Sequence, residues 1–327
     1  QRTPEEAAVM QVCPYDTSGP FAELQDPAFP AEQLVAIAFT SGSTGVPKPY
    51  PKYWSGIVHE ARIAGECLGL DAAGGQVLAT VPAQHMYGFV YSVILPAQWG
   101  YAIGAERPFY PEDIRRALVA LPGPAILVTT PVHLRRMRAD AELASLRSRA
   151  RAIFSSGGPL DESIARGIES VLGLTPIEIF GSTETGGVAW REQTPAEPDT
   201  AFRSFPEVEL ERSSAPGLEG QLVVRSPYAS LGPASAGRND VQETLMGDRA
   251  ELLGGGRFRL LGRADRIVKI GEKRLALPEM ESALRAHPYV ADAALVSFEP
   301  IGDARVGAVV ALSELGQAAL DAQGRRA

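Results

Sequence analysis

The chain has 327 residues, of which 45% are hydrophobic and 21% charged. These are ordinary proportions for a folded globular protein, so extensive disorder is excluded, and the length predicts about two domains. With 31 Lys and Arg against 39 Asp and Glu, the net charge of −8 argues against a general nucleic-acid binder. No apolar run approaches the roughly 18–20 residues of a membrane span. We therefore expect neither a nucleic acid nor a membrane as a partner.

Short β-branched runs alternate with amphipathic stretches through the first half of the chain. Expected helices cover residues 55–70, 111–121 and 161–172, and expected strands cover 34–39, 77–81, 125–129, 153–155 and 177–180. We expect the strand at 34–39 to be buried. Alternation of this kind predicts an α/β fold in which helices cover a mostly parallel sheet.

The character of the chain changes after Thr194, where helical patterns become rare. Strand-like runs at 208–210, 222–224 and 258–261 predict a small antiparallel β subdomain. A helix at 278–286 and strands at 293–298 and 306–312 then predict a small α+β domain, and residues 317–327 look frayed. We expect a large domain at 1–263 and a C-terminal domain at 264–327.

A loop rich in Gly, Ser and Thr directly follows the first expected strand. It reads Thr40, Ser41, Gly42, Ser43, Thr44, Gly45, Val46, Pro47, Lys48. Successive backbone N–H groups and hydroxyls of such a loop can bind phosphate oxygens, and Lys48 adds a mobile positive charge. The pattern G-x-x-x-x-G-K-[ST] is not met, because Pro47 stands five residues beyond Gly42. A solvated flexible loop is therefore the alternative interpretation.

Two further motifs follow at the ends of apolar runs. The first is Phe180, Gly181, Ser182, Thr183, Glu184, in which an aromatic face and a carboxylate could serve a planar ring and Mg²⁺. The second begins at Gly247 and Asp248 and continues with Gly262, Arg263, Asp265, Lys269 and Gly271. Taken singly, each of these motifs is also typical of a charged surface turn.

In this order, the motifs resemble those of the adenylate-forming superfamily of acyl- and aryl-CoA synthetases, peptide-synthetase adenylation domains and luciferases. The loop is similar to the family's T-S-G-S-T-G-x-P-K signature, and residues 180–184 to its aromatic-G-x-T-E motif. Gly247 and Asp248 match T-G-D except at Met246. The segment from Gly262 to Glu281 is similar to G-R-x-D…K-x-G…E-x-E.

The resemblance implies ATP and Mg²⁺ as ligands and assigns expected roles to matching residues. Residues 40–45 and Lys48 would hold the β- and γ-phosphates. Thr183 and Glu184 would contact the α-phosphate and Mg²⁺, and Asp248 with Arg263 the ribose. Gly157, Gly158, Pro159 and Phe180 would enclose adenine, with Gly181 and Ser182 completing the nucleotide site. The substrate pocket would comprise His85, Met86, Tyr87, Gly88 and Gly158. His85, Lys48, Thr183 and Glu184 would serve catalysis, and Asp265 would be a hinge.

The implied reaction joins a carboxylic acid, aryl or acyl, to a thiol. The acid attacks ATP to form an acyl-adenylate, which then reacts with coenzyme A or a carrier-protein phosphopantetheine. Two cysteines without metal-ligand spacing, Cys13 and Cys67, and the lack of a targeting pattern at residues 1–11 predict a cytoplasmic location.

The chain departs from the family pattern in two respects. It has no Lys after Lys273, where the family carries a terminal catalytic Lys, and few residues precede its phosphate loop. We expect a sequence truncated at both ends; the alternative is a non-catalytic nucleotide-binding relative. Lys48 is followed by Pro49, Tyr50, Pro51, Lys52, Tyr53 and Trp54, which resembles the AMP-ligases of aryl-polyene and xanthomonadin-type pigment clusters. That subfamily would favour an aryl or unsaturated acid and an acyl carrier protein.

Overall fold

The computed structural model describes residues 29–40, 48–71, 74–194, 201–229, 242–270, 273–298 and 305–323. The chain divides into two units, Gln1–Pro30 and Ala31–Ala327, and every element named below belongs to the second. Among the described residues, none of the helices combines the length and apolar character that a membrane crossing needs.

The second unit opens with a two-stranded antiparallel hairpin of β1 (Leu34–Thr40) and β2 (Lys48–Tyr53), followed at once by α2 (Trp54–Cys67). The expected strand at 34–39 is present, but the expectation that it is buried was wrong. Ile37 is 49% exposed and Phe39 64% exposed. The reason is that β1 pairs with β2 alone and does not enter the main sheet, so its apolar residues mark a strand but not a central one.

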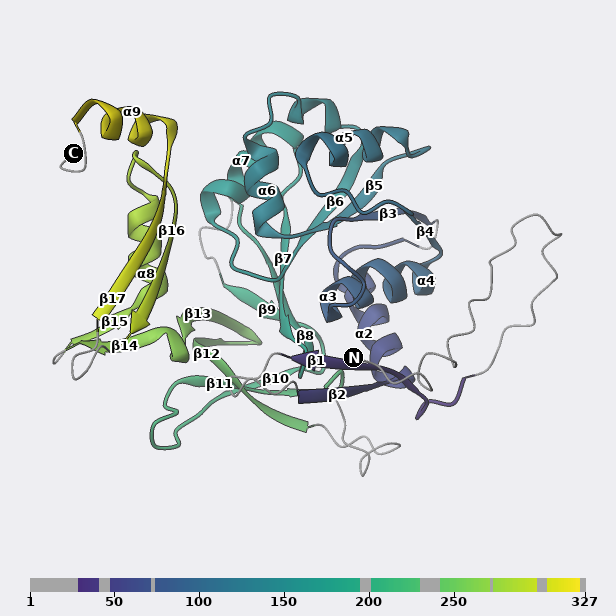
Figure 1. The fold of residues 1–327 in the computed structure, drawn as a ribbon. Helices are drawn as coiled ribbons and strands as arrows, with labels where there is room; N and C mark the ends of the chain where they lie inside the picture. Colours follow the sequence, from purple (N-terminus) through teal and green to yellow (C-terminus); the bar gives the residue numbers. More distant parts are fainter. Residues whose placement is uncertain are drawn as a thin grey trace, which may run out of the picture. The chain divides into compact units, whose positions relative to one another are not determined.

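Eleven strands of the described chain form one mixed sheet (Figure 1). Their spatial order is β10 (Glu209–Arg212), β11 (Gln221–Ser226), β12 (Gln242–Gly254), β13 (Arg257–Arg263), β9 (Phe202–Ser204), β8 (Gly186–Glu192), β7 (Ile177–Ser182), β6 (Ala150–Ser155), β5 (Ala125–Thr129), β3 (Gly75–Ala79) and β4 (Tyr101–Ile103). The strands from β4 to β7 are parallel, and those from β7 to β10 antiparallel. The α/β fold expected from the sequence is confirmed, and the antiparallel strands continue the parallel sheet.

The parallel part of the sheet is buried on both faces, as strand β5 illustrates. Ile126 and Val128 belong to a core shared with α2, η1 (Val90–Ile94, a π-helix) and α4 (Leu95–Trp99). Ala125 and Leu127 belong to a second core, shared with α5 (Pro111–Ala120), α6 (Pro131–Arg138), η2 (Leu143–Leu146) and α7 (Glu162–Leu172). A strand buried on both faces has no polar side, which is why β5 is apolar from Ala125 to Val128.

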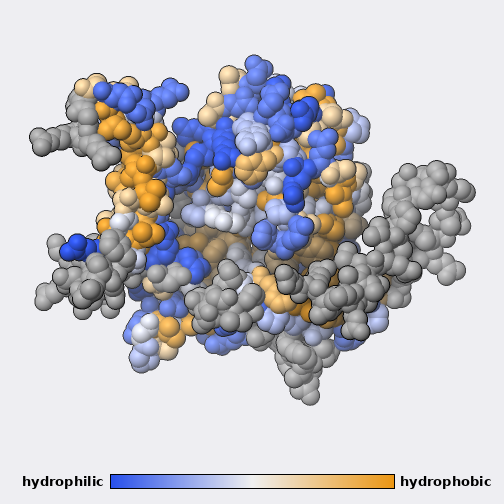
Figure 2. Space-filling view, viewed as in Figure 1, coloured by the Kyte–Doolittle hydropathy of each residue, from blue (hydrophilic) through white to orange (hydrophobic). Residues whose placement is uncertain are grey.

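The described C-terminal residues form a short 3-10 helix, two small hairpins and two α-helices. In chain order these are η3 (Ala264–Arg266), β14 (Ile267–Ile270), β15 (Lys273–Ala276), α8 (Leu277–Arg285), β16 (Val290–Phe298), β17 (Arg305–Leu312) and α9 (Glu314–Gln323). The expectation of a frayed tail from 317 was wrong as far as Gln323, because these residues continue helix α9. Figure 2 shows hydrophobic side chains gathered over the β16–β17 hairpin, where Val296 and Val309 are exposed.

Candidate functional site

Two cavities meet at the turn between β7 and β8. One, here called the aromatic cavity, has a volume of about 530 Å³, and the other, the acidic cavity, about 460 Å³. Gly181 and Ser182 line both. The next residue, Thr183, lines the aromatic cavity, whereas Glu184 lines the acidic cavity. Residues 181–184 of the predicted motif therefore lie where the two cavities meet.

Hydrogen bonds hold this turn in place. The backbone N–H of Ser182 donates to Thr185 Oγ1 at 3.1 Å, and Thr185 Oγ1 donates to the carbonyl of Gly186 at 2.9 Å. From β11, Ser226 Oγ donates to the carbonyl of Thr185 at 2.9 Å. Thr185 is fully buried, so the turn is tied to the core while its tip, Thr183 and Glu184, faces the cavities.

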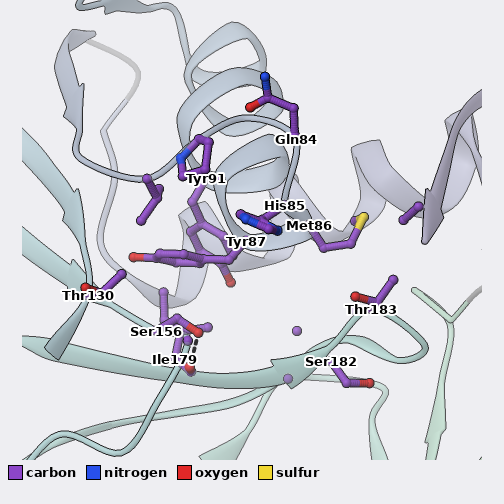
Figure 3. A pocket seen from close by; sticks show the side chains of 18 of the residues that line it. Gln84, His85, Met86, Tyr87, Tyr91, Thr130, Ser156, Ile179, Ser182 and Thr183 are labelled. Carbon is purple, nitrogen blue, oxygen red and sulfur yellow. Dashed lines mark hydrogen bonds between the residues drawn. The ribbon is translucent and has the colours of Figure 1, made fainter. Parts of the chain in front are cut away.

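The aromatic cavity brings together most of the predicted substrate pocket. His85, Met86, Tyr87 and Gly88 come from the start of α3 (Met86–Phe89), and Figure 3 shows the first three facing Ser156, Ser182 and Thr183 across the cavity. Ser156 Oγ donates to the carbonyl of Ile179 at 2.7 Å, which ties the turn after β6 to β7. Gly157 lines the cavity, whereas Gly158 and Pro159 line neither cavity.

The acidic cavity gathers the predicted ribose and magnesium residues. Glu184, Gly247, Asp248 and Arg263 all line it, and Arg263 Nη1 lies 3.7 Å from Asp248 Oδ2. Met246, at the place where the family has Thr, also lines it. Among the described residues, no three His, Cys, Asp or Glu side chains gather as a metal site. A cation at Glu184 would therefore need ligands from a nucleotide and from water.

The β1–β2 hairpin borders the acidic cavity through Tyr50. Its hydroxyl interacts with the side chains of Glu184 and Thr40. Burial and the Glu184 carboxylate raise the pKa of this hydroxyl. Thr40 and Lys48 are paired across the hairpin, so the loop between them begins and ends next to this site. Ser41, Gly42, Ser43, Thr44 and Gly45 themselves lie outside the described residues.

Two residues with predicted roles, Phe180 and Asp265, are not among the described residues that line the two cavities. Phe180 lines neither cavity, because side chains alternate along β7 and Ile179 takes the cavity face. The Phe180 ring instead lies 5.6 Å from that of Phe202 and 5.8 Å from that of Phe258. Asp265 lies in η3, but its side chain is outside the described part.

Sequence reasoning missed two buried ionisable side chains, Lys52 and Glu60, near the aromatic cavity. Lys52 of β2 is 2% exposed and Glu60 of α2 is 4% exposed, and Glu60 lines the cavity. Burial lowers the pKa of Lys52 to about 8 and raises that of Glu60 to about 7, and each charge partly offsets the other shift. A detectable signal existed for Glu60, since it shares one helical face with Ile57, Ala61 and Ala64.

Comparisons with known proteins agree with these observations. A family model described as "AMP-binding enzyme" matches residues 2–232. A 4-coumarate–CoA ligase of Rhodobacter capsulatus is 31% identical over 299 residues, covering 90% of this chain and 67% of the relative. A 4-chlorobenzoate–CoA ligase of Arthrobacter is 27% identical, covering 88% and 56%.

The fold also matches solved structures. That of ATP-bound MatB from Rhodopseudomonas palustris superposes with a TM-score of 0.73 at 22% identity, covering 90% of this chain and 62% of that one. The chain thus spans roughly three fifths to two thirds of the length of these relatives.

Proposed function

Because this chain belongs to the AMP-binding enzyme family, we propose that the protein activates a carboxylic acid with ATP and transfers the acyl group to a thiol. In the first step, a carboxylate oxygen attacks the α-phosphorus, the bond to the β-phosphate oxygen breaks, and pyrophosphate leaves. In the second, a thiol sulfur attacks the acyl carbon, AMP leaves, and the thiol proton is released.

The observation that carries this proposal is the junction of the two cavities. Gly181 and Ser182 line both, so an acid in the aromatic cavity and a nucleotide in the acidic cavity would meet at Thr183. Adenylation depends on this juxtaposition and does not require a covalent intermediate with the enzyme. Its activation barrier falls when the two reactants are held in line and their charge is neutralised.

Most of the predicted roles of individual residues fit this arrangement. Lys48 and residues 40–45 would bind the β- and γ-phosphates, Thr183 the α-phosphate, and Asp248 with Arg263 the ribose. Glu184, a hard oxygen ligand, would hold Mg²⁺ together with phosphate oxygens and water. The ion neutralises phosphate charge when bound. His85 lines the aromatic cavity with Thr183, where it would orient the carboxylate. The predicted enclosure of adenine by Gly157, Gly158, Pro159 and Phe180 does not follow from this arrangement, because Gly157 lines the aromatic cavity and the other three line neither cavity.

An aryl acid is the substrate class that the aromatic cavity supports best. Its lining includes Tyr87 and Tyr91 on one side and, on β7 and β8, the glycines Gly181, Gly186 and Gly187. The backbone of these glycines forms part of the wall, and a planar ring packs well against the aromatic side chains opposite. A volume of about 530 Å³ suits a small ligand of this kind.

The acceptor thiol and the hinge complete the proposal. Coenzyme A or a carrier-protein phosphopantetheine would take the acyl group, and the small domain at 264–327 would rotate about Asp265 between the two steps. The end of β13 at Arg263 supports this boundary. The location we propose is cytoplasmic.

A screen of the full-length protein tests the function. It is incubated with ATP, Mg²⁺ and a panel of aromatic, unsaturated and fatty acids, and pyrophosphate is measured. Release with at least one acid is expected, followed by a thioester with coenzyme A or a phosphopantetheinylated carrier protein, detected by mass spectrometry. Nucleotide binding without pyrophosphate from any acid would favour a non-catalytic relative instead.

A further inference from the structure

The buried carboxylate of Glu60 lines the aromatic cavity, although burial of a charged group is costly. Glu60 reaches the cavity from the buried face of α2 and is 4% exposed. Its Oε1 accepts a hydrogen bond from the backbone N–H of Gly187 at 2.8 Å. A carboxylate has about four acceptor positions, so one such bond leaves most of its hydrogen-bonding capacity for other donors.

The two glycines of β8 make room for this carboxylate. A Cβ atom on Gly186 would lie 2.7 Å from Glu60 Oε2, and one on Gly187 would lie 3.0 Å from Oε1. The same Cβ on Gly187 would lie 3.3 Å from Tyr91 Oη. The Glu60 carboxylate and the Tyr91 hydroxyl therefore both lie beside Gly187 on the wall of the cavity.

Two polar atoms around Glu60 are buried and without a hydrogen-bond partner among the described residues. They are Lys52 Nζ and Tyr91 Oη. Lys52 interacts electrostatically with both Glu60 and Glu184. Burial of such groups is costly unless they are paired, and replacing a buried charged pair with apolar residues is often neutral or stabilising. Stability alone therefore does not account for this cluster.

We propose that Glu60 is a specificity-determining residue that accepts a hydrogen bond from a hydroxyl group carried on the body of the carboxylic acid substrate. A hydroxyl suits this part of the wall because it can donate to the carboxylate and accept from the Tyr91 phenol. Lys52 acts as a positioning residue, because its positive charge stabilises the ionised form of Glu60. This inference rests on the proposed function, since it concerns the acid of the same cavity.

The expected selectivity follows from the unfavourable free energy of binding an acid that lacks the hydroxyl group. Such an acid would displace water from Glu60 without replacing its hydrogen bonds, and leaving a buried charged acceptor unpaired is strongly unfavourable. Sites built around a substrate hydroxyl reject the analogue without it by large factors. We expect a preference of about 100-fold or more for the hydroxylated member of a matched pair.

The test compares acids that differ by one hydroxyl group. Benzoate is paired with 3- and 4-hydroxybenzoate, and cinnamate with 4-hydroxycinnamate. Equilibrium binding and kcat/KM for pyrophosphate release are measured on the full-length protein. In Glu60→Gln the preference is expected to fall at least tenfold. A double variant, Lys52→Met with Glu60→Leu, serves if Glu60→Gln folds poorly, because it removes both buried charges together. It is expected to abolish the preference for the hydroxylated acid.

Glu178→Gln serves as the matched control. Glu178 is likewise 4% exposed, but it pairs with Arg191 at 2.7 Å and lines neither cavity. The Glu178→Gln variant should keep the wild-type preference for hydroxylated acids.

Lys52→Met should raise the pH at which the preference appears, because the positive charge that favours ionised Glu60 is lost. The titratable groups around Glu60 are Lys52, Tyr91 and Tyr228, with Glu184 beyond Lys52.

The outcomes separate this inference from the proposed function. Pyrophosphate release without any hydroxyl preference, or an equal preference in wild type and Glu60→Gln, would overturn the inference and leave the function standing. Selective binding of hydroxylated acids without pyrophosphate release would support the inference and refute the function. Binding of none of the paired acids would refute the inference.

Discussion

Neighbouring residues of this chain have different surroundings, and the turn after β7 is the clearest case. Thr183 and Glu184 are adjacent in sequence, yet the first lines the aromatic cavity and the second the acidic one. The same contrast separates Ile179, on the cavity wall, from Phe180, in an aromatic cluster. A role assigned to a residue by motif therefore has to be tested residue by residue.

Glu184→Gln is expected to lower Mg²⁺-dependent pyrophosphate release by at least about tenfold, because an amide is a weaker ligand for a hard cation. Thermal unfolding should change little, since the side chain faces a cavity. The matched control is Glu106→Gln, on an exposed loop before α5. Equal activity of Glu184→Gln and wild type across Mg²⁺ concentrations would remove Glu184 from the metal site.

Glu60 makes stability depend on pH in a defined window. Burial raises its pKa from 4.5 to about 7, against the opposing effects of Lys52 and the Gly187 N–H. Between these values the unfolded chain has released the proton while the folded chain keeps it, so the free energy of unfolding falls as pH rises. Glu60→Gln should remove the decrease in the free energy of unfolding that the titration of Glu60 causes, on the order of 2–3 kcal/mol.

Urea denaturation of wild type and Glu60→Gln at pH 4.5, 6 and 7.5 measures this difference. The wild-type minus variant free energy should decrease with rising pH and level off above about 7. Parallel curves for the two proteins would mean that Glu60 titrates at its ordinary pKa in the folded state.

At the scale of elements, the β7–β8 pair depends on close backbone approach. Gly181 pairs with Gly187, and Ser182 with Gly186. A Cβ on Gly181 would lie 2.3 Å from the Gly186 carbonyl oxygen. Since both strands are fixed by their outer neighbours β6 and β9, they have little freedom to move apart.

Gly181→Ala is therefore expected to destabilise the protein by about 1–3 kcal/mol through overpacking. Gly56→Ala is the control, because its Cβ would make an ordinary 3.7 Å contact and alanine favours the helix α2. Chemical denaturation of both variants measures the effect. A Gly181→Ala protein as stable as Gly56→Ala would show that the two strands separate easily.

At the scale of the whole molecule, one sheet carries both cavities. Its parallel strands supply the turns at 156–157 and 181–184, and its antiparallel strands supply Asp248 and Arg263. The β7–β8 pair is where the strand direction reverses.

Asp265→Ala tests the proposed hinge. It is expected to slow thioester formation several-fold more than adenylation, because only the second step would follow the domain rotation. Single-turnover kinetics of pyrophosphate release and of thioester appearance separate the two steps. Equal slowing of both would place Asp265 in a general structural role.

Sequence reasoning proposed the site residues because short motifs of this chain resemble those of the family. The roles of His85–Gly88, Thr183 and Glu184 came from that resemblance. It missed Tyr50, Lys52 and Glu60, since their importance depends on what packs against them. Tyr50 matters through Glu184, which lies 134 positions later in the sequence.

The order of short apolar runs and helical patterns by itself determined the α/β class, and four ordered motifs determined the family. Local interactions and periodicity suffice for the class, whereas the family follows from the resemblance of the motifs. Only the tertiary structure decided that β1 is exposed, that the antiparallel strands extend the parallel sheet, and that a buried glutamate lies under an aromatic cavity. Strand partners and burial are set by contacts between residues distant in sequence, which local patterns do not encode.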